Sequence, residues 1–593
     1  SKLFEEQSFF NATRNSLIGG RANIDSGGNS NTIFGFNNNL TDVSNVLVNG
    51  MNNVLTTDSQ SIILGDTNTS ISTVNGITVG KNNKSRNITT SILSGTSLDV
   101  SVNTVNSIII GNTNKEKTGI NNATFGNTNT GITNTNTLVS GKNNISTSNT
   151  ESGIIGTSNQ SSSNVNSFMI GNTNQSSTNS QILLIGSNNT TVTNNSDTII
   201  SGLNNISKTN TNSLLIGTQQ NTDTNANILV GGNLNIVKTT DDSIISGKQN
   251  IIENVKESSI LGSYNDVSGN SQYSLITGKS NKQFNSKQTI LGGSTNRIDN
   301  AENVLSIGLT NKIKNVLNTT VLGESNDVSG NTNQSLIVGL SNSNNNNKYN
   351  VTYGKLNITK DSTGSMAGGE NNFTKSVTNG VSFGNNNKLE NVSASMALGE
   401  LNDISGNSKN TLISGKQNNE NNGNNNTILG NEEKVKNSTN ILVSGKNNTL
   451  LNDTESIVIG LSNTLNNSEK VGIIGESNTV SNTTINSVVF GKSNQESNGN
   501  NNLLSGTTNQ NTGGISNLIS GSNNDVTTAT DTVVFGKSNT ITNGNNNIIS
   551  GLSQTINDSS NNIVDGDSNK LVKIGNSAVY VKVQDISGSY DVL

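Results

Sequence analysis

Apolar residues recur along the chain in short runs at a fixed spacing. The run Ile108-Ile109-Ile110 precedes Gly111, and equivalent runs precede 37 glycines between Gly20 and Gly566, called anchor glycines here. Of the 36 intervals between them, 30 are 15 residues long and six are 16. Each run is about three residues long and rich in β-branched side chains, which predicts a short strand. A period of 15 is too short for helical-hairpin repeats.

This period predicts an all-β fold, a single long parallel β-solenoid or β-roll of about 37 coils with 15–16 residues per coil. Each coil is expected to contain a strand, a Gly-x-x-Asn corner, a second short strand and a variable corner. Successive coils would pair in parallel at about 4.8 Å per coil, which predicts a shaft of roughly 170 Å. The expected boundaries are 15–570 for the solenoid, with terminal segments at 1–14 and 571–593.

The third residue after the anchor glycine is Asn in 33 of 37 coils, and the exceptions are Leu98, Gln220, Glu433 and Gln554. Glycine permits a positive φ or a close backbone approach, and Asn tolerates the left-handed region. Identical Asn side chains one coil apart can also form a hydrogen-bonded ladder. Representative structural corner residues are Gly111, Asn114, Gly141, Asn144, Gly171, Asn174, Gly247 and Asn250.

The residues three and two positions before the anchor glycine are both mostly apolar. Because successive strand residues point to opposite faces, one of each pair would face the interior and the other would form an apolar stripe along the outside. Such a stripe favours self-association; the alternative is a corner that turns both residues inward. Representative pairs are Ile62 and Ile63, Ile108 and Ile109, Leu183 and Leu184, and Val488 and Val489.

Composition agrees with a chain that is paired into sheet throughout. The sequence contains no Pro, which would break the ladder. Hydrophobic residues make up only 29%, a value typical of disordered chains, but their strict spacing argues against disorder. The net charge of −5 arises from 35 basic and 40 acidic residues, so no nucleic-acid partner is expected. No apolar stretch is long enough to predict membrane insertion.

Candidate catalytic and ligand-binding chemistry is scarce. The chain has no His and no Cys, which removes the commonest general base and the thiolate metal ligands. Carboxylates are scattered, and no phosphate-binding loop stands in a strand-to-helix context. We therefore expect no enzyme activity, no cofactor and no metal site.

The segments Asn106-Ser107-Ile108-Ile109-Ile110-Gly111 and Asn166-Ser167-Phe168-Met169-Ile170-Gly171 resemble the head repeats of YadA-like trimeric autotransporter adhesins. That resemblance covers about residues 15–570 and implies left-handed parallel β-rolls that trimerise along their axis. The period here is 15 rather than about 14, and larger aliphatic residues usually replace the small central Ala. We identify no neck motif, heptad stalk or membrane anchor in the sequence.

Both ends of the sequence break the repeat and carry large apolar side chains. We expect them to cap the solenoid or to dock to another copy, because solenoid ends expose unpaired strands. The candidate docking residues are Phe4, Phe9, Phe10, Val579, Val581 and Val583.

The favoured function is a non-enzymatic extracellular structural rod or self-assembling surface fibre. Its expected partner is itself, as a homotrimer, an end-to-end filament or both. The alternative is an adhesin that binds a host or neighbouring-cell ligand. An ice-binding solenoid is disfavoured because Thr is scattered rather than aligned in a column. The expected location is the cell surface or extracellular space, or alternatively a virion or phage fibre.

Overall fold

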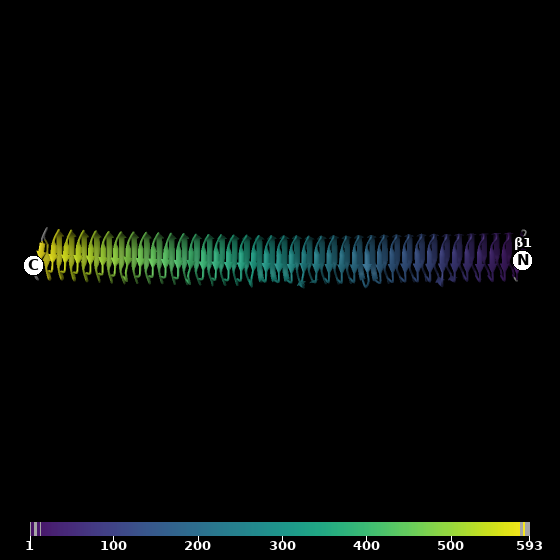
Figure 1. Cartoon of the computed structure of the whole chain (residues 1–593), viewed down its shortest axis with the longest axis horizontal. Helices are drawn as coiled ribbons and strands as arrows, with labels where there is room; N and C mark the ends of the chain where they lie inside the picture. The colour runs from purple at the N-terminus through teal and green to yellow at the C-terminus, as the bar shows by residue number, and fades with distance from the viewer. Residues whose placement is uncertain (1, 5–8, 12, 581–584, 588–593) are drawn as a thin grey trace. The chain divides into compact units, whose positions relative to one another are not determined.

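The computed structural model describes residues 2–4, 9–11, 13–580 and 585–587. These residues divide into two compact units, Ser1–Thr295 and Asn296–Leu593. Each unit is a parallel β-solenoid, with about 38 turns of about 15 residues in all, and the described ranges contain no helix. The all-β solenoid prediction is therefore confirmed. Within each unit, the strands of successive coils lie side by side (Figure 1).

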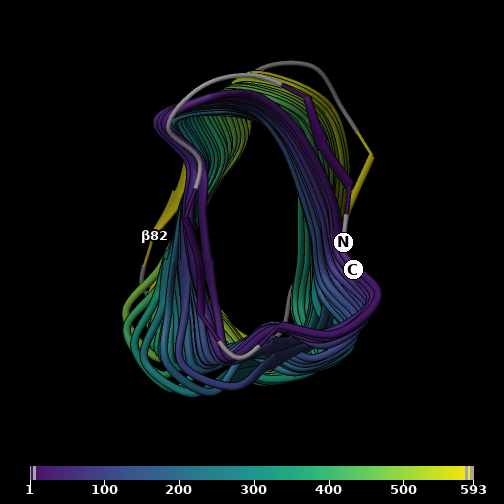
Figure 2. The same ribbon diagram turned by 90° about the vertical axis from the view of Figure 1, so that its right-hand side faces the viewer.

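Each coil contributes one strand to each of two sheets. In a representative coil, β17 (Ile108–Asn112) belongs to the first sheet, here called sheet A, and β18 (Lys115–Lys117) belongs to the second, sheet B. β17 pairs in parallel with β19 (Ala123–Asn127), with Gly111 opposite Gly126. β18 pairs with β20 (Thr130–Ile132) in the same register. The strands thus meet their equivalents one coil later, and within each unit successive coils follow nearly the same closed path (Figure 2).

A third, shorter side closes the coil. It is marked by single bridges such as Ile120 to Thr135. In five coils this side merges with the sheet A strand into an eight-residue strand: β27 (Ser180–Ser187), β29 (Ser196–Leu203), β43 (Lys287–Ser294), β45 (Glu302–Leu309) and β47 (Leu317–Glu324). The coil is therefore three-sided rather than two-stranded as predicted.

Three corner residues per coil adopt the left-handed conformation. In the representative coil they are Thr113, Thr118 and Asn121, with φ of 58°, 55° and 55°. Asn, Ser, Thr and Asp occupy most of these corners because short polar side chains tolerate positive φ. Proline, whose φ is fixed near −65°, fits none of them. The corners therefore account for much of the polar composition of the chain.

The interior is lined by two columns of side chains. The residue two before each anchor glycine is buried, as is the middle residue of each sheet B strand from Asp25 to Leu571, whereas Ile586 of the last described strand is partly buried. In unit 2, a continuous apolar cluster runs from Val377 to Val579. In unit 1, shorter apolar clusters, such as Ile18–Ile63, alternate with polar stretches of interior. The interior is thus apolar in part and hydrogen-bonded in part.

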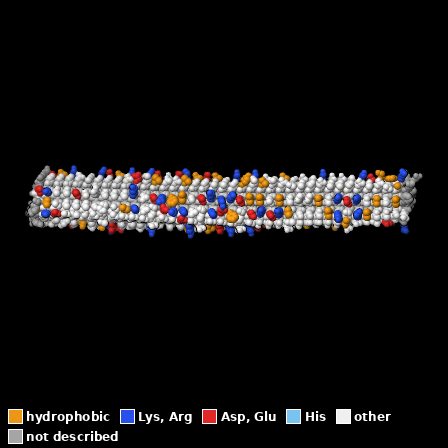
Figure 3. All heavy atoms as spheres, in the orientation of Figure 1, with side chains coloured by type: hydrophobic (Ala, Val, Ile, Leu, Met, Phe, Trp, Pro, Cys, Tyr) orange, Lys and Arg blue, Asp and Glu red, His pale blue; other side chains and the backbone are white. Residues whose placement is uncertain are grey.

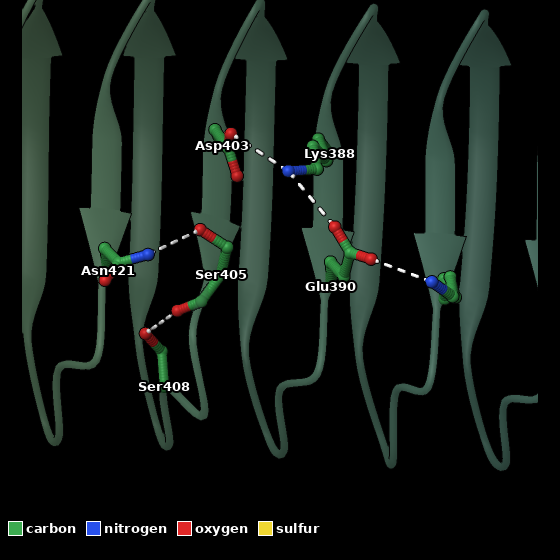
Figure 4. A network of polar contacts seen from close by, with 7 residues as sticks. Lys388, Glu390, Asp403, Ser405, Ser408 and Asn421 are labelled. Carbon is green, nitrogen blue, oxygen red and sulfur yellow. Dashed lines mark hydrogen bonds and ion pairs between the residues drawn. The ribbon is translucent and has the colours of Figure 1, made fainter.

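The 16-residue coils absorb their extra residue at the corner after sheet B. In an ordinary coil, the Ser438 hydroxyl donates to the carbonyl of Lys436, two residues back, at 2.9 Å. In a longer coil, the Ser408 hydroxyl donates to Ser405, three residues back, at 2.7 Å (Figure 4). A wider corner closed by the same kind of bond leaves the strand register unchanged.

Both ends keep the coil register where they are described. β1 (Lys2–Phe4) pairs in parallel with β3 (Leu17–Arg21), and β2 (Phe9–Asn11) pairs with β4 (Ile24–Ser26). β81 (Ala578–Val579) pairs with β79 (Ile563–Asp567). β82 (Asp585–Ser587) pairs with β80 (Lys570–Val572). The expected boundaries at 15 and 570 therefore do not mark where solenoid pairing starts and stops.

Candidate interaction surface

The anchor glycines lie inside the sheet A strands, not at a corner as predicted. Gly247 belongs to β35 (Ile244–Lys248) and has a φ of 132°. A Cβ atom placed on it would lie 1.6 Å from the carbonyl oxygen of Gly262, one coil on. The stack is close enough at this column that only hydrogen fits, and this explains why every coil carries glycine here.

The Asn that follows each anchor glycine is buried and binds the next coil. Asn250 is fully buried; its backbone N–H and Nδ2 each lie 3.0 Å from Oδ1 of Asn235, one coil back. Its Nδ2 also donates to the carbonyl oxygen of Gly262 at 2.9 Å. The equivalent bonds to the next anchor glycine measure 2.9, 2.8 and 2.8 Å for Asn114, Asn144 and Asn174. The anchor glycine therefore lets successive coils approach closely, and the Asn hydrogen-bonds the carbonyl group of the next anchor glycine.

The exceptions in this column show what the ladder tolerates. The backbone N–H of Leu98 still donates to Oδ1 of Asn83 at 3.0 Å, but the Leu98 side chain has no amide with which to hydrogen-bond the next coil. Glu433 accepts the N–H of Asn448 at 2.8 Å and its Nδ2 at 3.1 Å. Burial raises the pKa of Glu433 to about 7, so near neutral pH its carboxyl is partly protonated.

The structure places one residue of each apolar pair inside and the other outside. Ile109 is fully buried, whereas Ile108 is 38% exposed. The same holds for the other pairs: Ile63, Leu184 and Val489 are buried, and Ile62, Leu183 and Val488 are half-exposed. The residue next to the anchor glycine, such as Ile110 at 39% exposure, also points outward. The outer face of sheet A thus carries two columns before the glycine, at three and one residues before it, and a third column at the outward-facing residue that follows it.

The two outer columns of sheet A that precede the glycine are apolar and almost uncharged. Over 37 coils they contain 74 positions, of which 52 are apolar and one, Asp565, is charged. The column three residues before the glycine alone is apolar in 31 coils. In unit 1, a groove of about 630 Å³ follows this column and is lined by Ile199, Leu214, Leu229 and Ile244 together with Asp197, Asn212, Asn227 and Asp242. An apolar surface of this length is unusual for solvent-facing strands.

The outer face of sheet B differs. Its two outward columns contain 25 charged and 14 apolar residues among 74 positions. Lys388 lies between Glu390 at 3.2 Å and Asp403 at 3.4 Å, and Glu390 also pairs with Lys375 at 3.0 Å (Figure 4). This is the composition expected of a face in contact with water.

Charged residues on sheet A gather at the residue that follows the anchor glycine. There they form ion pairs between successive coils, including Lys355–Glu370 at 3.0 Å and Lys416–Glu400 at 3.2 Å. In the space-filling view, apolar and charged side chains are spread over much of the visible face rather than gathered in one isolated patch (Figure 3). An apolar centre with a charged margin matches the anatomy of a protein–protein interface.

The terminal candidates are only partly described. Val581 and Val583 lie outside the described residues. For Phe4, Phe9 and Phe10 the structure gives backbone pairing alone. Val579 is 2% exposed and pairs with Val564, so it belongs to the interior. Whether the ends dock to another copy stays a prediction.

One recurrent feature escaped the sequence prediction. Glu116, Glu420 and Glu496 are buried in the interior column of sheet B, each followed by Gly three residues later and Asn six residues later. The sequence contains these residues as a spaced motif, Glu-x-x-Gly-x-x-Asn. The prediction missed the motif because it assigned acidic residues to the solvent-exposed surface.

Among the described residues, no group of three or more acidic, His or Cys side chains is placed to hold a metal ion. The same residues include no helix able to cross a membrane. No protein-family model and no curated protein matches this chain.

Proposed function

We propose that this protein is a non-enzymatic structural rod whose copies pack side by side through the outer face of sheet A. The observation that carries the proposal is the near absence of charge from the two outward columns of sheet A before the anchor glycine, with one charged residue in 74 positions, against one in three in the two outward columns of sheet B. Both faces point away from the interior, so folding of the coil does not account for the difference. Burial against another copy does.

The available area is sufficient for stable association. Specific interfaces bury about 800 Å² per partner. Burial of about 40 Å² per coil would reach that value over about 20 coils, which is about half of the 37 in the chain. Because each buried Å² of apolar surface contributes about 25 cal/mol, small gains per coil accumulate along the stack.

A trimer is the stoichiometry we propose, on the resemblance to YadA-like heads. The solenoid fold and the phased Asn-Ser-apolar-Gly segments support that resemblance, which also underlies the proposed extracellular or cell-surface location. The charge balance supports a function without nucleic acid. A virion or phage fibre would use the same construction.

An adhesive function is the second candidate, supported by the 16-residue coils. Grooves of about 420 and 280 Å³ lie beside the extra residues of two such coils, which are five coils apart in unit 2. Asn331 and Asn407 form part of their walls. These are local departures from the repeat, as a ligand-binding face requires. Shortening both corners by deleting Asn331 and Asn407 should abolish cell binding if the grooves act, and should leave assembly unchanged.

Electron microscopy and sedimentation of the full chain test the structural proposal. We expect elongated particles of roughly 170 Å, from about 4.8 Å per coil, that associate laterally at micromolar concentration. A monodisperse monomer under these conditions would contradict lateral packing. Compact particles would contradict the rod.

A further inference from the structure

Buried carboxyl groups recur in one architectural setting. The middle residue of the sheet B strand is acidic in four coils: Asp25, Glu116, Glu420 and Glu496. In all four, Gly stands three residues later and Asn six residues later. A fifth coil carries the same motif with an amide, Asn511, followed by Gly514 and Asn517. All five side chains are buried.

The glycine of the motif leaves room for the acid. A Cβ on Gly119 would lie 2.2 Å from Oε1 of Glu116, and one on Gly499 would lie 1.6 Å from Oε1 of Glu496. The carboxyl group thus occupies the space that a side chain would otherwise fill. The pairing of acid and glycine is therefore a steric requirement of the site.

The Asn of the motif donates a hydrogen bond to each acid; Thr124 Oγ1 adds one to Glu116, and Asn511 Nδ2 adds two to Glu496. Nδ2 of Asn122 donates to Oε1 of Glu116 at 2.7 Å, and Nδ2 of Asn502 donates to Oε1 of Glu496 at 2.7 Å. Nδ2 of Asn426 donates to Oε1 of Glu420 at 2.9 Å. The second oxygen of Glu420 is buried without a hydrogen-bond partner. An uncharged amide orients each carboxyl but does not neutralise it.

No cation from the surrounding strands faces these acids. Glu116 lies between Val100 and Gly131, Glu420 between Ile404 and Val435, and Glu496 between Val480 and Asn511. The charged residues of the sheet A and sheet B strands that hold and flank the three acids are all on the outer surface: Asp99, Lys115, Lys117, Glu400, Asp403, Lys416, Lys434, Lys436, Glu476 and Lys492. Glu433, at the corner next to Glu420, is also acidic. A charged carboxylate here would have no counter-ion, which is costly inside a protein.

We propose that these motifs are built proton-binding sites, in which the solenoid holds carboxyl groups as neutral acids so that acidification stabilises the folded coils. In the Asn511 coil, an uncharged amide with the shape of a protonated Asp side chain fills the same site. This inference concerns the interior and is independent of self-association.

The direction of the pH effect follows from burial. Burial raises the pKa of Glu116 and Glu496 to about 7 and that of Glu420 to about 8, from 4.5. The folded state therefore binds protons more tightly than the unfolded state. The stabilisation is complete below about pH 4.5 and is lost as the pH rises through 7 to 8. Across that range the folding equilibrium constant changes on the order of a hundredfold for Glu116 and for Glu496, and on the order of a thousandfold for Glu420.

Thermal unfolding of the full chain between pH 4 and 9, followed by circular dichroism, tests the proposal. We expect the wild-type melting temperature to fall as the pH rises from 5 to 8. The variant Glu116→Gln/Glu420→Gln/Glu496→Gln should show a smaller fall. A matched variant with Gln at three exposed glutamates, Glu151, Glu253 and Glu257, should keep the wild-type fall. Equal falls in both variants, or a wild-type melting temperature that does not decrease, would overturn the proposal.

Infrared spectroscopy gives a readout that needs no variant to fold. At pH 6 the wild-type protein should show the carbonyl stretch of protonated carboxyl groups, and this band should disappear as the pH rises to 9. Its absence at pH 6 would show that the buried acids are ionised and would contradict the proposal directly.

Discussion

Sheet A and sheet B are built from the same coils, yet their outer faces differ in almost every respect. The two columns of sheet A before the anchor glycine hold one charged residue and the two outward columns of sheet B hold 25, over equal numbers of positions; in sheet A, charge is concentrated at the margin after the glycine, where 16 of 37 residues are charged. Inside, both sheets follow one rule, with a buried residue in each strand of each coil. The repeat therefore determines the interior and leaves the exterior free. A difference in the exterior points to function rather than to folding.

The largest expected effect comes from the glycine column of sheet A. Gly247→Val would place Cβ against the carbonyl oxygen of Gly262 and would put a β-branched residue at a φ of 132°. We expect a loss of at least about 3 kcal/mol in the free energy of unfolding. Lys208→Val, on the outer face of β30 (Ile206–Lys208) in sheet B, should cost less than about 0.5 kcal/mol. Chemical denaturation compares the two, and similar losses would show that the glycine column is not special.

The buried Asn ladder gives an intermediate effect. Asn250→Leu copies the residue found naturally at Leu98 and leaves the carbonyl of Gly262 without its side-chain donor. We expect a cost of about 1–3 kcal/mol. The exposed ladder provides the control: Asn212 donates to Asn227 at 3.0 Å on the surface, and Asn212→Gly keeps its left-handed backbone. Hydrogen exchange in the affected coils should increase only for the Asn250 variant; an equal increase in both would contradict the distinction.

The smallest effect is expected for the ion pairs of sheet B. Hydrogen bonds from Lys375 and Lys388 lower the pKa of Glu390 from 4.5, so its contribution is present above that pH and fades as the pH falls. Because the group is on the surface, Glu390→Gln should cost well under about 1 kcal/mol. That cost should vanish in high salt. A larger, salt-independent loss would mean that the charged face of sheet B is structural.

Much of this structure could be predicted from the spacing of residues. The period and the parallel pairing follow from the spacing of the anchor glycines, and the alternation of strand side chains predicts that one residue of a pair such as Ile108 and Ile109 faces inward, but not which one. The position of Gly111 inside its strand could not be predicted, because it depends on the distance between stacked backbones. The third side of the coil was missed because single bridges at residues such as Ile120 leave no apolar run.

The buried acids were missed for a different reason. Glu116 is flanked by Lys115 and Lys117, so its sequence resembles a solvated strand. Only the coil geometry shows that the middle residue of sheet B faces inward, beside Gly119 and Asn122. Charged residues in solenoids therefore need to be read by their position in the coil before they are assigned to the surface.

The central claim is that the outer face of sheet A is an interface and that of sheet B is not. Ile244 and Ile251 test it in one coil, since both are 45% exposed, the first on sheet A and the second on sheet B. Ile199 and Ile206 form a second matched pair, at 42% and 39% exposure. Sedimentation equilibrium should show that Ile199→Lys/Ile244→Lys weakens association markedly, whereas Ile206→Lys/Ile251→Lys associates as the wild type does. Equal association of the two variants, or loss in the sheet B variant alone, would contradict the account.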